Sequence, residues 1–178
     1  MYQEILDFWF REISPADWWT KSEAFDRLLK QRFLNVLEQA SRCELYEWRK
    51  TPGGRLAEII LLDQFSRNIY RDTPRAFAQD AQALALAQEV IAAGIHRSLS
   101  AIERNFLYMP YMHSESLIIH EQAVILFTEN GLVDNLDFEL RHKAIIERFG
   151  RYPHRNNILG RMSTPEEIEF LSQPGSSF

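Results

Sequence analysis

The sequence predicts an all-α fold, and three observations lead to that prediction. Residues typical of helix N-caps precede several segments, glycine follows several of them, and apolar residues between these positions recur at three-four spacing. No segment alternates apolar and polar residues over the length of a strand. We therefore expect about seven or eight helices, joined by short loops that suit antiparallel neighbours.

The expected helix starts are Thr-Pro pairs and capping boxes. A threonine hydroxyl accepts a hydrogen bond from the first helical turn, and a proline there has no N–H to leave unsatisfied. Ser100 with Glu103, and Thr164 with Glu167, have the spacing of a capping box. The Thr-Pro pairs stand at 51–52, 73–74 and 164–165, and the glycines that follow helical runs are Gly94, Gly131 and Gly150.

The helical runs follow in order along the chain. An apolar stripe covers 22–41, and eight alanines with other apolar residues favour a helix over 74–93. The segments 117–127 and 140–149 continue this pattern. Pro110 interrupts what would otherwise be one helix over 101–129, so we expect a break or kink there.

Composition predicts a single all-α domain over 1–178 with a packed core. Hydrophobic residues make up 46% of the 178 residues. Cys43 has no second cysteine to pair with, and we expect a buried thiol. No signal-like N-terminus and no apolar run near the ~18 residues of a membrane span occur, so we expect a soluble, cytoplasmic protein without a membrane partner. The aromatic residues expected in the core include Phe8, Trp9, Phe10, Trp18, Trp19 and Trp48.

Arginine is concentrated in two segments of an otherwise acidic chain. The formal net charge is −5, yet the segment 148–165 holds four arginines and no acid. The segment 61–72 has the same pattern as 145–156: two aliphatic residues, an acid, any residue, Phe, a small residue and Arg, then Arg and Asp or Asn after three more residues. This offset of 84 residues suits a duplicated helical pair, although chance similarity is an alternative.

Arginine binds carboxylates and phosphates with a planar fork, so these segments are candidates for anion binding. Arg67 and Arg151 each lie one turn after an acid, Asp63 or Glu147, and helix-terminal salt bridges are the alternative for them. The better ligand candidates lie in expected loops: Arg71, Arg75, Arg155 and Arg161.

Histidines accompany the arginines. Pro153 holds Tyr152 extended, which would present His154 on a preorganised loop. His113 and Glu115 follow Pro110, and they either point into a pocket or flank Ser114 as the N-cap of the next helix. These three residues, His113, Glu115 and His154, are our weak catalytic candidates.

Signatures of common enzyme classes are missing. The chain has no phosphate-binding glycine loop, no nucleophile elbow and no paired CxxC. His113, His120 and Glu121 lack the adjacent-turn spacing of helical zinc sites, so we expect no metal, and we expect no cofactor.

Three blocks of the sequence resemble a bacterial family known as domain of unknown function 924. They are LLDQFSRNIYRDTPRAFAQD, FLYMPYMHSES and RFGRYPHRNNILGRMSTPEE, and the likeness extends over essentially the whole chain. The resemblance implies antiparallel helical pairs in a tetratricopeptide-like α-α superhelix, with no established activity. Two departures are Ser66, where the family commonly has proline, and His120, where it commonly has another polar residue. The resemblance marks as signature residues Asp63, Gln64, Arg67, Asn68, Arg75, His113, Ser114, Glu115, Arg151, His154, Arg155, Asn156 and Arg161.

Three functional hypotheses follow. The first is a binding module whose arginine-rich pocket holds an anionic small molecule or an acidic peptide. The second is an enzyme acting on a phosphate- or carboxylate-bearing metabolite, with His113 or His154 as the acid–base group. The third, nucleic-acid binding, is disfavoured by the net acidity. The predicted ligand-binding residues are Arg67, Asn68, Arg71, Arg75, His113, Arg151, His154, Arg155, Asn156 and Arg161.

Overall fold

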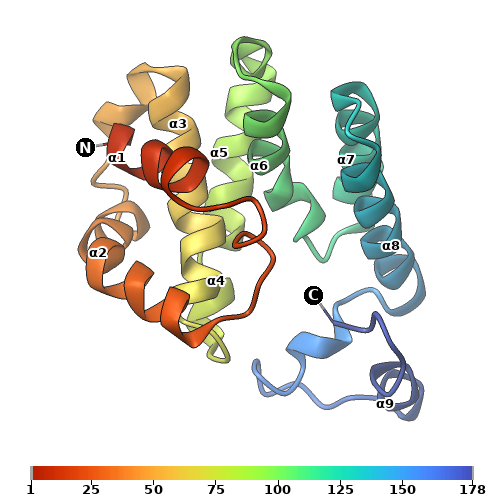
Figure 1. The fold of residues 1–178 in the computed structure, drawn as a ribbon. Coiled ribbons are helices and arrows are strands. Elements are labelled where there is room, and N and C mark those ends of the chain that lie inside the picture. Colours follow the sequence, from red (N-terminus) through yellow and green to blue (C-terminus); the bar gives the residue numbers. More distant parts are fainter. Residues whose placement is uncertain (1, 178) are drawn as a thin grey trace.

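The computed structural model describes residues 2–177, and helices joined by loops account for the fold of this part (Figure 1). A π-helical stretch, Leu61–Phe65, joins α3 (Pro52–Ile60) to α4 (Ser66–Ile69) in one continuous helix. With α3 and α4 counted as one, the described residues form eight α-helices and contain no strand. The predicted all-α class and helix number are confirmed. The helices are α1 (Tyr2–Asp7), α2 (Glu23–Ser41), α3 (Pro52–Ile60), α4 (Ser66–Ile69), α5 (Asp80–Ala92), α6 (Ala101–Met112), α7 (Leu117–Asn130), α8 (Val133–Phe149) and α9 (Pro165–Leu171).

Most of the predicted helix caps are present. The Thr51 hydroxyl accepts a hydrogen bond from the Gly54 amide at 3.0 Å, and both predicted capping boxes form, at the starts of α6 and α9. Thr73 differs, because its side chain caps nothing and a short 3₁₀ turn follows it. The helix predicted from residue 74 therefore begins only at Asp80.

The break expected at Pro110 occurs three residues later. α6 continues through Pro110 to Met112, because a proline in the last turn removes only one hydrogen bond from a helix that is about to end. Ser116, not Ser114, precedes α7, and the Ser114 hydroxyl accepts a hydrogen bond from the Ser116 amide at 3.2 Å. The interpretation of Ser114 as the N-cap was wrong.

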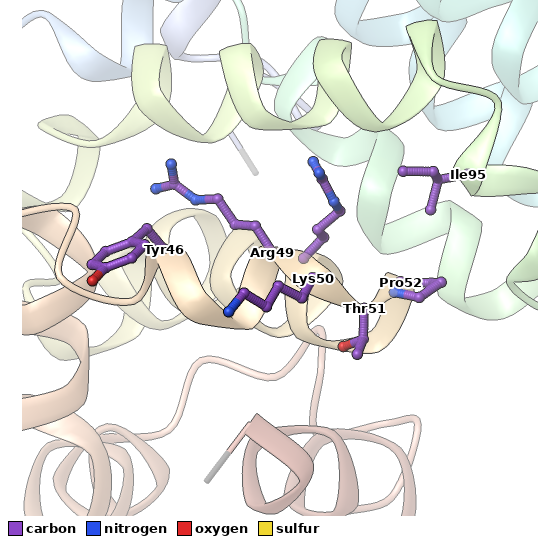
Figure 2. Close-up of a pocket in the computed structure, with 7 residues that line it drawn as sticks. Tyr46, Arg49, Lys50, Thr51, Pro52 and Ile95 are labelled. Atoms are coloured by element: carbon purple, nitrogen blue, oxygen red, sulfur yellow. The ribbon is translucent and has the colours of Figure 1, made fainter.

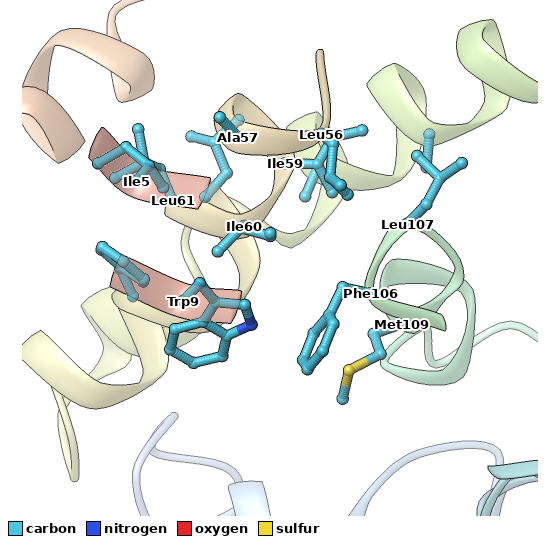
Figure 3. Packing of buried hydrophobic residues seen from close by; sticks show 14 of the residues in the cluster. Ile5, Trp9, Leu56, Ala57, Ile59, Ile60, Leu61, Phe106, Leu107 and Met109 are labelled. Atoms are coloured by element: carbon cyan, nitrogen blue, oxygen red, sulfur yellow. The ribbon is translucent and has the colours of Figure 1, made fainter. Parts of the chain in front are cut away.

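The main core surrounds α3, which packs against α1, α5 and α6. Trp9 is fully buried there, with its ring centroid 5.5 Å from that of Phe106 (Figure 3). Burying each such side chain contributes about 2–3 kcal/mol. Two predictions about burial were wrong: Trp19 is 56% exposed, and Cys43 lies at the surface.

The C-terminal segment lies beside α8 (Figure 1), where a small second cluster holds it. Tyr152 is buried with Ile145 and Ile146, and Phe149 packs on Phe170 of α9 at 5.0 Å between ring centroids. This packing brings the second arginine segment back toward the first. Among residues 2–177, no helix has the length and apolar character that a membrane crossing needs.

Candidate functional site

A cavity of about 800 Å³ receives residues from both arginine segments. Its wall comes from the loop before α2, the segment 64–77, the inward face of α6, part of α8 and the loop after α8. Arg67 and Asn68 contribute from the first segment, and His154 and Arg155 from the second. The fold thus brings together side chains that lie almost half the chain apart.

The first segment enters the cavity through the π-helical stretch. A π-helical turn shifts the phase of the following residues, and such turns are frequent at functional sites. Here the carboxylate of Asp63 is fully buried. Arg67 lies 3.1 Å from that carboxylate, which confirms the ion pair considered for these two residues. Its Nη1 and Nη2 also donate to both carboxylate oxygens of Asp80, at 2.9 and 3.0 Å.

The second segment contributes Arg155, whose side chain is 7% exposed. Its Nη1 lies 3.2 Å from Asp80, so the two guanidinium groups share one carboxylate. Its Nη2 donates to the His113 carbonyl at 2.9 Å, and its guanidinium carbon lies 4.6 Å from the ring centroid of Phe77. Burial and the charge of Arg67 lower the pKa of Arg155, and its buried Nε has no hydrogen-bond partner among the described residues.

His113 and Asp63 form a buried pair at the edge of the cavity. The His113 Nδ1 lies 2.7 Å from the Asp63 carboxylate, and Gln64 donates to the other oxygen at 2.6 Å. Burial raises the pKa of Asp63, but the opposing effects of Arg67 and His113 are larger together and lower this pKa to about 2. Burial and then Arg67 lower the pKa of His113 below its usual range. At neutral pH the imidazole is therefore neutral and donates from Nδ1 to an ionised carboxylate.

The other histidines of the cavity are neutral as well. Burial lowers the pKa values of His142 and His154 to about 3, with Arg155 as the next cause for His154. The positive charge of the cavity therefore comes from arginine and from Lys21.

Arg71 also lines the cavity, but much of its binding capacity is used. It donates to both carboxylate oxygens of Asp26, at 2.6 and 2.8 Å, and to Asn68 Oδ1 at 2.8 Å. We therefore regard Arg71 and Asn68 as supports for the wall rather than as the first contacts of an anion.

Four predicted ligand-binding residues and Glu115 lie outside the lining. Arg75 is 63% exposed and stacks on Tyr70. The others, Arg151, Asn156 and Arg161, belong to a network of ion pairs and hydrogen bonds with Glu115 and Glu167.

This network holds the loop that carries Arg155. Arg161 pairs with both oxygens of Glu115, at 2.6 and 2.9 Å, and Glu115 also accepts from the Tyr152 amide at 2.7 Å. Arg151 pairs with Glu167 at 2.6 Å and not with Glu147, which instead contacts Lys143. The salt bridge considered between Glu147 and Arg151 is therefore absent from the described structure.

A second hollow, of about 530 Å³, lies at the start of α3 (Figure 2). Arg49 and Lys50 face it, but Arg49 is bonded to both oxygens of the buried Glu58, at 2.7 and 2.6 Å. Lys50 pairs with Glu47. Arg55 also lines this hollow and has no ion pair among residues 2–177. Within the described part of the chain, the hollow lacks a buried arginine with an unpartnered nitrogen, which the 800 Å³ cavity has in Arg155, so we regard it as the weaker candidate for an anion.

Sequence reasoning missed several residues of the site. Asp80, which contacts both arginines but does not line the cavity, lies in the first turn of α5 and looks there like an ordinary helix-dipole residue. Asn105 is a polar residue inside an apolar helix, a signal that could have been noticed. Many of the other missed residues are aromatic or sulfur-containing, among them Trp18, Trp19, Phe77, Met109, Met112 and Phe138. Missed polar and charged residues of the lining include Lys21, Asp72, Asn135 and His142.

The fold and the cavity define an all-α protein in which guanidinium groups from two distant segments, the half-buried Arg67 and the buried Arg155, meet at one carboxylate. The chain belongs to the family described as bacterial protein of unknown function (DUF924), whose model matches residues 5–175. It is also similar to the solved structure of ATU0120, a protein of unknown function from Agrobacterium tumefaciens, with 38% identity, a TM-score of 0.90 and 96% of each chain covered. None of the curated proteins matches the chain. The resemblance noted in the sequence is confirmed.

Proposed function

We propose that the 800 Å³ cavity binds an anionic small molecule. The observation that carries this proposal is that Arg67 and Arg155 meet at one carboxylate, Asp80. Asp63 contacts Arg67 and His113, so Asp80 is the carboxylate that Arg155 contacts. A ligand carboxylate or phosphate beside Arg155 would provide an acceptor for its Nε, which has no partner among residues 2–177.

The lining also indicates what the rest of the ligand is like. Trp19, Met109 and Phe138 give the cavity apolar walls, and its volume lies within the range of small-molecule sites. An anion with an apolar body therefore fits better than inorganic phosphate. An acidic peptide would have to insert one carboxylate and an apolar neighbour.

Arg155→Lys tests this function without removing the charge. Lysine cannot reproduce the planar fork, so we expect affinity for aryl carboxylates such as 4-bromobenzoate to fall about tenfold or more in isothermal titration. Arg67→Ala is a poor test, because an uncompensated buried Asp63 would cost about 3–5 kcal/mol of stability.

Arg75→Ala is the matched control, since Arg75 is exposed and lies outside the cavity. It should leave the affinity unchanged. Equal affinities of the wild type and Arg155→Lys would contradict the proposal, as would a failure of the wild type to bind any carboxylate of an aryl and alkyl panel.

A second function, catalysis of proton transfer, is supported by the Asp63–His113 pair. A buried carboxylate that holds Nδ1 leaves Nε2 as the proton acceptor of a general base. The substrate would be the same class of anion, with a proton near its charged group, and the pH profile of a His113→Gln variant tests this function.

A further inference from the structure

Asn105 is a buried polar side chain of the cavity that no contact within the described chain explains. It is 4% exposed, lies in α6 and contributes to the lining. Its buried Oδ1 has no hydrogen-bond partner among residues 2–177. A buried amide oxygen without a donor is costly, so a group that approaches from the cavity would bind there favourably.

The place of Asn105 along α6 gives the cavity two polar ends. Asn105, Met109, Met112 and His113 follow one another at helical spacing and all line the cavity. His113 lies eight positions after Asn105, which corresponds to about 12 Å along the helix. Arg155 is bonded to the His113 carbonyl, so the guanidinium groups lie at one end and Asn105 at the other.

The middle of this path is mainly apolar, although Gln64 also lines the cavity and donates to Met109 Sδ at 3.4 Å. The two methionines lie between the ends, and the Trp18 ring packs 4.9 Å from Phe106, the neighbour of Asn105. Methionine side chains adapt to apolar ligands of varied shape. A ligand that reaches from the arginines to Asn105 must therefore carry an apolar spacer.

We propose that the ligand is an elongated anion whose far end carries an amide-type group that donates a hydrogen bond to Asn105. This inference rests on the proposed anion binding, which supplies the other end of the ligand. A carboxamide, or the amide edge of a nucleobase, has the N–H that Asn105 Oδ1 lacks.

The probes that test this inference are the monoamides of straight-chain dicarboxylic acids, from adipic to sebacic acid. Each is compared with a monocarboxylate of equal length that has an isopropyl group in place of the carboxamide. In the wild type, the best monoamide should bind about tenfold more tightly than its isopropyl counterpart, because the amide fills an unmet hydrogen bond. In an Asn105→Leu variant, which has a side chain of similar size, the two affinities should be equal.

Stability provides an independent readout of the same variant. Leucine removes a buried amide that lacks a partner, so Asn105→Leu should raise the Tm of the unliganded protein by about 2–4 °C. A lower Tm would show that the amide supports the fold, and would overturn the inference.

The two proposals can fail separately. If each monoamide binds no better than its isopropyl counterpart in the wild type, Asn105 only holds solvent and the inference is overturned, while anion binding stands. If none of these carboxylates binds the wild type, anion binding falls and the inference falls with it.

Discussion

His113 is the residue whose chemistry depends most on its neighbours. Asp63 is buried and bonded to Nδ1, which fixes the tautomer and leaves the Nε2 lone pair available at the cavity edge. Burial and Arg67 lower the pKa of His113, so this lone pair is already free below the usual titration range of histidine.

If the cavity is catalytic, its turnover should rise with pH through a pKa below 6.5 and be flat at neutral pH, because only the neutral imidazole accepts a proton. His113→Gln should abolish turnover and leave the affinity for 4-bromobenzoate within about twofold of wild type, since Gln is uncharged like the neutral ring. Carboxylate metabolites would be screened in D₂O by NMR for exchange of a C–H proton, and the exchange rate of a responding metabolite would be measured as a function of pH. A His113→Gln variant with an unchanged profile would refute the assignment.

At the scale of elements, the 151–164 loop is positioned by α9. Glu167 closes the capping box of this helix and accepts hydrogen bonds from Arg151 and Asn156. The Arg151 guanidinium is the main cause that lowers the pKa of Glu167 to about 2. The ionised Glu167 carboxylate therefore adds to the free energy of unfolding at neutral pH. This contribution is lost as the pH falls from about 4.5 through about 2.

Glu167→Gln should lower the Tm by about 5 °C at neutral pH, because the paired carboxylate loses its charge. It should also weaken binding of 4-bromobenzoate, since the loop that carries Arg155 loses a support. Glu166→Gln is the matched control, because Glu166 is exposed and contacts Arg148 at the surface. Thermal unfolding curves that show equal losses for both variants would contradict this role of α9.

The elements also show what sequence could and could not supply. Caps and periodicity predicted the helices, because those signals are local: the Thr51 hydroxyl bonds three residues away. The ion-pair partner of a buried charge, in contrast, cannot be identified from local sequence patterns. Arg67 and Arg155 bind Asp80, and Arg151 binds Glu167, at separations of 13 to 75 residues that local pattern cannot resolve.

For the same reason, some of the predicted site residues line the cavity, and others are bonded to carboxylates outside it. The sequence showed where guanidinium groups are dense, but it could not show which of them already have a carboxylate partner. Arg161 had the same loop position as Arg155 and is bonded instead to both oxygens of Glu115. Trp19 was expected in the core because tryptophan is hydrophobic. Its exposed ring lines the cavity instead, where the same apolar surface can contact a ligand.

At the scale of the whole molecule, an acidic chain gathers three arginines and one lysine in the lining of one hollow, and the arginines are paired with aspartates. The net charge is −5, and the remaining surface carries many acids that would repel an anion elsewhere. The main core around α3 fixes the first arginine segment, and the small cluster on α8 fixes the second. Their convergence is therefore a property of the fold as a whole.

A crystal structure of the protein soaked with 4-bromobenzoate tests this convergence most directly. We expect the anomalous peak of bromine within the 800 Å³ cavity near its apolar wall, and the carboxylate within hydrogen-bond distance of Arg155. Bromine peaks only at other sites, or guanidinium groups of Arg67 and Arg155 that do not share Asp80, would contradict the account.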